Sequence, residues 1–310
     1  MLLIVGAVIV VLSVAGGYLM EGGQAVVLNQ PSEFLIIGGA AFGSLLIGTP
    51  PPILKELFVQ CKGLFRSAQG KDEYVGLLSL LYQLFKLSQQ GGVMALESHF
   101  EAPAKSPILM KHPKFLARHD AVDFLADSVK VMIIGGISPH DLETLMDEDL
   151  EVRHHCASRP AATLNKMADA LPGLGIVAAV LGVVITMGAI DGPAAEIGHK
   201  VGAALVGTFL GVLLSYGFTQ PLATHLELRM AEHTHYELCI KAGLVAIYKG
   251  LPPAIAIEFA RRVLPEDVRP SFDETEMFCK ARKSEAAAGS DPAAAPPASA
   301  AVSSTPAAAV

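Results

Sequence analysis

The chain has 310 residues, of which 52% are hydrophobic and only 17% are charged, and its mean hydropathy is +0.46. This balance is too apolar for an ordinary soluble domain and indicates a membrane protein. The net charge of −7 says less than the distribution of charges along the chain. We expect no nucleic acid partner.

Four windows lack Asp, Glu, Lys and Arg over about the 20 residues that a helix needs to cross a bilayer. They predict spans at 2–20, 34–51, 171–190 and 201–224, with a linker at 21–33. Any one of them could be a buried core helix, but four such windows in a chain this apolar make that reading improbable. The first could also be a signal peptide, although no basic segment precedes it and no clear cleavage site follows it.

The distribution of basic residues predicts how the spans are oriented. Thirteen of the 23 Lys and Arg residues lie in 55–166 and nine in 225–310, whereas 21–33 has none and 191–200 has only Lys200. Positively charged segments resist translocation, so we expect the two basic regions and both termini in the cytoplasm. The predicted location is a bacterial inner membrane.

Outside the predicted transmembrane hairpins 1–54 and 171–224, the sequence indicates a helical cytoplasmic domain at 55–170 and a helical extension at 225–283. Val75, Leu78, Leu81 and Phe85 recur at helical spacing and predict an amphipathic helix. The segment 139–152 also reads as a helix, and we expect its acidic residues to form a solvated face. The Ala-, Pro- and Ser-rich tail, 284–310, is predicted to be disordered. The fold class is an all-α membrane protein.

No nucleotide-binding, nucleophile or metal-binding motif is present, so we expect neither an enzyme nor a cofactor. The four cysteines are scattered and predict reduced thiols rather than disulfides or a zinc site. The predicted spans also lack the ionisable group that ion-conducting proteins usually hold at membrane depth. If the protein moves ions, a partner must supply the carboxylate.

Small residues and prolines distinguish the predicted spans. The GxxxG patterns at 39–43 and 207–211 allow close helix packing, either inside the chain or between subunits, and we favour subunit contacts. Pro172 is expected to open the third span and Pro221 to close the fourth, at matching depth. A proline near a helix end permits a bend, so the pair suggests a hinge.

Several stretches, in order along residues 1–280, resemble the MotA/PomA family of flagellar stator A subunits. They are GGYLM at 16–20, QPSE at 30–33, LPGLGIVAAVLG at 171–182, DGPAAE at 191–196, VGTFLG at 206–211, YGFTQPL at 216–222, PPAIAIEF at 252–259 and RPSF at 269–272. The resemblance implies five A subunits around two single-span B subunits in membrane lipid. In that assembly, each B subunit carries the ion-binding aspartate and a peptidoglycan anchor.

The resemblance also implies roles for individual residues. Residues matching Pro172 and Pro221 couple ion passage to movement, and those matching Ala179, Thr208 and Tyr216 face the B helices and the ion path. Chain length and the acidic helix favour protons as the coupling ion, with a sodium-driven PomA-type stator as the alternative.

The cytoplasmic domain of this family presents charged residues to the rotor protein FliG. Glu97 aligns with the rotor-facing acid, but Gln89 stands where a basic residue is expected, and Lys86 lies one turn away. The related ExbB/TolQ class is another alternative, but its members have three spans, and the N-terminal hairpin argues against it.

Overall fold

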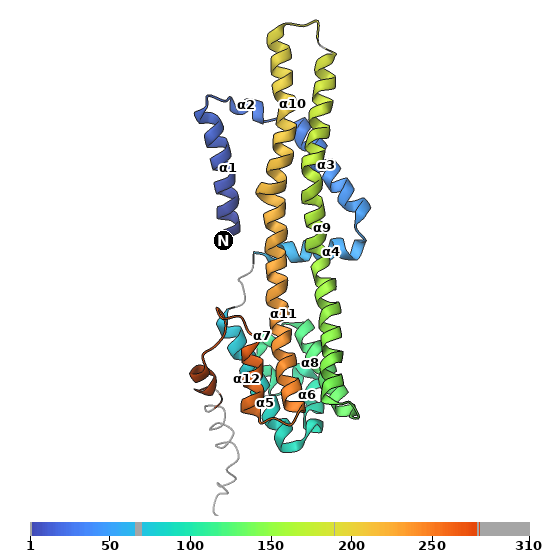
Figure 1. Ribbon diagram of the computed structural model, residues 1–310, viewed down its shortest axis with the longest axis vertical. Helices are drawn as coiled ribbons and strands as arrows, with labels where there is room; N and C mark the ends of the chain where they lie inside the picture. The colour runs from blue at the N-terminus through green and yellow to red at the C-terminus, as the bar shows by residue number, and fades with distance from the viewer. Residues whose placement is uncertain (1, 66–69, 189, 278, 280–310) are drawn as a thin grey trace, which may run out of the picture.

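The computed structural model describes residues 2–65, 70–188, 190–277 and 279 (Figure 1). The predicted disordered tail, 284–310, lies outside the described residues. Every regular element in the described part of the chain is a helix. Four helices are long and apolar enough to cross a membrane, which confirms the all-α membrane fold.

The first two spans are separate helices, of which the first stands apart at one edge and the second packs against the third and fourth spans (Figure 1). Helix α1 (Leu2–Met20) is followed by the short α2 (Ala25–Leu28) and by α3 (Pro31–Gly48). The chain turns at Thr49 and Pro50, so the second span ends before residue 51, where we had placed its boundary. Helix α4 (Pro51–Gly63) then crosses the long axis of the molecule (Figure 1).

The third span is not a separate helix. Helix α9 runs without interruption over Pro139–Met187, 49 residues, with Pro160 and Pro172 inside it. We predicted a helix at 139–152 and a span at 171–190 with Pro172 at its start. Residues 139–152 are helical as expected, but they and residues 171–187 belong to one helix, so Pro172 lies inside a helix and does not open one. A helix of this length extends about 74 Å.

The fourth span continues into the domain in the same way. Helix α10 (Ala194–Leu214) passes into a π-helical segment, η4 (Ser215–Thr219), and then into α11 (Gln220–Tyr248). We predicted that Pro221 closes the fourth span. It lies in the first turn of α11, after the π segment and Gln220, and the helix continues through it. Figure 1 shows α9 and the α10–α11 rod lying side by side along the molecule.

The remaining helices gather around the lower halves of α9 and α11 (Figure 1). Leu78, Leu81 and Phe85 are fully buried in this core, as the helical spacing predicted. The elements are α5 (Lys71–Gly91), η1 (Val93–Leu96), α6 (Glu97–Glu101), η2 (Pro103–Lys105), η3 (Leu109–Lys111), α7 (Pro113–Leu116), α8 (His119–Ile134) and α12 (Pro253–Arg262).

Ion pairs join the two long helices inside this domain. Lys241 of α11 lies 2.5 Å from Asp147 of α9, and Lys249 lies 2.8 Å from Glu143. The hydrogen bond from Lys249 lowers the pKa of Glu143. Part of the acidic face that we expected to be solvated therefore pairs with α11, and helps to hold the two rods together at their lower ends.

In the membrane part, α9 and α10 pack through glycines. A Cβ at Gly211 would lie 2.7 Å from the Leu171 carbonyl oxygen and 2.8 Å from the Gly175 Cα. The 207–211 pattern therefore packs inside the subunit, where we had favoured a subunit contact. By contrast, Gly39 and Gly43 of α3 have open space where a side chain would be.

Candidate functional site

The predicted ion-path residues lie on the α9–α10 hairpin and its continuation into α11. Ala179 and Thr208 are half-buried and lie at one level, because the Ala179 amide nitrogen is 3.1 Å from the position of a Cβ at Gly207. Pro172, also half-buried, lies one level lower, next to the Leu171–Gly211 contact. On this hairpin the small Ala179 side chain and the Thr208 hydroxyl therefore lie at one level, and Pro172 lies below them.

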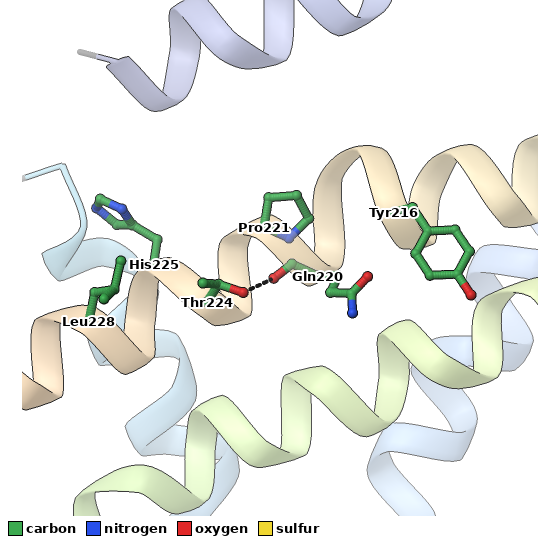
Figure 2. A pocket seen from close by; sticks show the side chains of 6 residues that line it. All are labelled: Tyr216, Gln220, Pro221, Thr224, His225 and Leu228. Atoms are coloured by element: carbon green, nitrogen blue, oxygen red, sulfur yellow. Dashed lines mark hydrogen bonds between the residues drawn. The ribbon is translucent and has the colours of Figure 1, made fainter.

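Tyr216 and Pro221 lie together on an exposed face below this level. They border an open hollow of about 400 Å³, with Gln220, Thr224, His225 and Leu228 (Figure 2). Tyr216 is 59% exposed, although its ring belongs to the π segment inside the fourth span. The hollow therefore opens onto the outer surface of the single chain and not into its core.

The π segment is a local irregularity that the sequence did not predict. The Gln220 amide bonds the Ser215 carbonyl, five residues back, and the Thr219 hydroxyl donates to the Leu214 carbonyl at 2.9 Å. Pro221 follows and has no N–H to donate to the preceding turn. Single-turn π segments of this kind occur often at functional sites.

Glu33 is the residue of this region that sequence reasoning missed. We placed it just outside the second span, but it lies in the first turn of α3 and is only 7% exposed. The Oε2 atom of Glu33 lies 2.6 Å from the position that a Cβ would take at Gly207. This oxygen has no hydrogen-bond partner among the described residues. An ionisable group therefore sits against the fourth span, beside Thr208.

The three predicted rotor-facing residues lie at the end of the molecule away from the spans. Gln89 is exposed near the end of α5, and Lys86 is half-buried one turn earlier. Glu97 is exposed at the start of α6, which η1 joins to α5. No ion pair links Lys86 to Glu97 in the part of the chain that the structure describes.

Comparison with known proteins agrees with this architecture. A model of the motility protein A N-terminal region matches residues 4–92, and a model of the MotA/TolQ/ExbB proton channel family matches 117–237. Motility protein A of Salmonella typhimurium is 42% identical over 282 residues, 91% of this chain and 96% of that protein. Motility protein A of Escherichia coli K12 is also 42% identical, over 284 residues and the same shares.

A solved structure shows the same fold. A chain of the Campylobacter (C. jejuni) MotAB structure superposes with a TM-score of 0.70, covering 87% of this chain and 98% of that one, at 21% identity. The fold is that of a multi-pass helical membrane protein. Its third and fourth spans carry prolines and hydroxyl side chains and continue into a helical domain. The chain belongs to the motility protein A family, within the MotA/TolQ/ExbB proton channel family.

Proposed function

We propose that this chain is the A subunit of a bacterial flagellar stator and that it converts ion flow into torque on the rotor. The observation that carries this proposal is the match of residues 4–92 to the motility protein A N-terminal model. That region contains the hairpin that distinguishes these proteins from the three-span ExbB/TolQ class. The 42% identity to two motility A proteins supports the same role. No chemical reaction on a substrate is part of it.

A single-span B-type partner supplies the ion-binding aspartate in this proposal, and the ion is a proton. The family model describes a proton channel, and the C. jejuni relative is titled MotAB. Glu33 does not replace the partner, because its carboxyl group is buried against Gly207 inside the subunit. The ion path then runs between the partner helix and the face that carries Ala179, Thr208 and Tyr216.

The proposal also includes an assembly and an orientation. Five copies of the chain surround two partner helices, and the exposed apolar faces of the spans contact neighbouring copies and lipid. The domain around α5 and α8 and both termini lie in the cytoplasm, because 22 of the 23 basic residues lie in or next to that domain or in the tail. The loop between α9 and α10 is then periplasmic.

Ion conduction should require the partner. Produced alone in cells under a proton gradient, this chain should not acidify the cytoplasm, whereas co-production with a B-type partner should. Intracellular pH, followed with a ratiometric probe after an external acid step, measures the difference. The control is a partner whose ion-binding aspartate is replaced by asparagine. Acidification by the chain alone would contradict the borrowed carboxylate.

The rotor contact, in this proposal, is made with FliG by the end of the domain that carries Glu97. Glu97 is exposed and unpaired by any described basic group, so its charge is available to a partner. Gln89 leaves the expected basic position neutral, which shifts more of the electrostatic contact to Glu97. Exposed charge pairs contribute only about 0–1 kcal/mol each.

Reversing the charge at Glu97 should slow swimming more than removing it. Glu97→Lys adds repulsion toward a basic rotor surface, whereas Glu97→Gln only removes attraction, so the two variants separate charge from shape. Swimming speed and soft-agar spread at matched expression are the measurements. Glu101→Lys, exposed one turn further along α6, is the matched control. If Glu97→Lys swims like the parent, the rotor contact lies elsewhere on the domain.

A further inference from the structure

Pro172 leaves one carbonyl of α9 without its helical donor. In a regular helix the amide at position 172 would donate to the Ala168 carbonyl, four residues back. Proline has no amide hydrogen, so that bond cannot form, although α9 continues through Pro172. Ala168 is fully buried. A buried carbonyl without a donor destabilises the fold, so another group must take the place of the amide.

The missing donor comes from the neighbouring rod. The Ser215 hydroxyl lies 2.6 Å from the Ala168 carbonyl oxygen and donates to it. Ser215 is 1% exposed and is the first residue of the π segment. The bond therefore joins the irregular point of α9 to the irregular point of the α10–α11 rod, 47 residues apart in sequence.

We propose that Ser215 is a positioning residue that couples the two proline sites. Its hydroxyl stands in for the amide that Pro172 lacks, and its backbone begins the π segment that ends just before Pro221. A change in the bend of α9 at Pro172 then moves or breaks this bond and so reaches the segment below the fourth span. This inference rests on the stator function proposed above, because it assigns a residue to the coupling step of that function.

The glycine contacts explain why a short side chain serves here. Gly175 and Gly211 bring α9 and α10 into backbone contact one turn above, with a Cβ at Gly175 placed 3.0 Å from the Gly211 Cα. At that helix separation a serine hydroxyl reaches the facing carbonyl directly. The hydroxyls of Ser128 and Thr186 differ, since each donates to a carbonyl four residues back in its own helix.

A double-mutant cycle on the purified complex with the B-type partner tests the hydrogen bond. Ser215→Ala should lower the apparent thermal midpoint by roughly 2–6 °C, because it leaves the Ala168 carbonyl unpaired. In a Pro172→Ala background the restored amide serves that carbonyl, so the same substitution should cost less than half as much. Ser128→Ala, a buried serine bonded within its own helix, should show no such dependence on residue 172. Equal costs of Ser215→Ala in both backgrounds would overturn the assignment.

The positioning role is tested by the ratio of movement to ion flow. In cells with the partner, Ser215→Ala should still acidify the cytoplasm but should swim more slowly for the same ion flow. A merely structural hydroxyl would lower both in proportion to the amount of assembled protein, and that result would overturn the positioning role. Failure of the parent chain itself to conduct with its partner would instead overturn the proposed stator function.

Discussion

Gly211→Val should remove the protein from the membrane fraction and abolish motility. A Cβ at this position would lie 2.7 Å from the Leu171 carbonyl oxygen and 2.8 Å from the Gly175 Cα. These are backbone atoms of α9, so they cannot swing away, and the two spans must separate along their contact. Overpacking a buried contact typically costs about 1–3 kcal/mol, and a separation of two backbones adds the packing lost on either side.

Quantitative blotting of membranes and soft-agar spread measure this effect. The matched control is Gly202→Val on the same helix, since a Cβ at Gly202 has nothing within 4 Å. That variant should accumulate like the parent. Normal accumulation of Gly211→Val would show that α9 and α10 do not pack through these glycines.

Pro172→Ala and Pro221→Ala should each leave insertion and partner binding intact, raise thermal stability and abolish or strongly impair swimming. Alanine restores an amide donor, and a proline inside a helix costs about 3 kcal/mol relative to alanine. If the predicted coupling uses a bend at these prolines, the same stiffening removes it. The distinctive result is therefore a more stable stator that generates little torque.

Thermal midpoints of the purified complex, co-purification with the partner and swimming speed together decide this prediction. Pro160→Ala is the matched control, because it removes a proline from the same helix but twelve residues below Pro172, between Ala157 and Ala161, which contact or cluster with α4. We expect Pro160→Ala to swim. A Pro172→Ala or Pro221→Ala protein that fails to assemble would make that proline structural and would remove support for the hinge.

The four spans could be predicted from sequence because a run of about 20 uncharged apolar residues matches the length of a helix that crosses a bilayer and is uncommon in other structures. The continuity of α9 could not. Pro160 and Pro172 are ordinary signals for a helix end. The Ala168 carbonyl that Pro172 leaves free accepts a hydrogen bond from Ser215, 47 residues away in sequence. A contact between distant residues of this kind leaves no local pattern in the sequence.

The site was predicted unevenly for the same reason. Pro172 and Pro221 were located from their positions at the ends of the predicted spans, and Ala179, Thr208 and Tyr216 through family resemblance. The structure places all five on one hairpin and its continuation. Their functional roles stay predictions. Glu33 was missed because its importance comes from a neighbour, Gly207, which lies against its carboxyl group. The GxxxG pattern at 207–211 was visible in the sequence, but a pair of glycines does not indicate which helix packs against them.

In the coupling role predicted for Pro172, the unbroken part of α9 below it would act as a lever with its pivot at that proline. The 33 residues from Pro172 down to Pro139 measure about 50 Å, so a swing of about 10° at the pivot carries the far end through about 9 Å. Leu142, Met146 and Leu150 are buried in the domain core, so the domain must travel with that end. A small change of angle at Pro172 would then move the charged end of the domain by nearly the diameter of a helix.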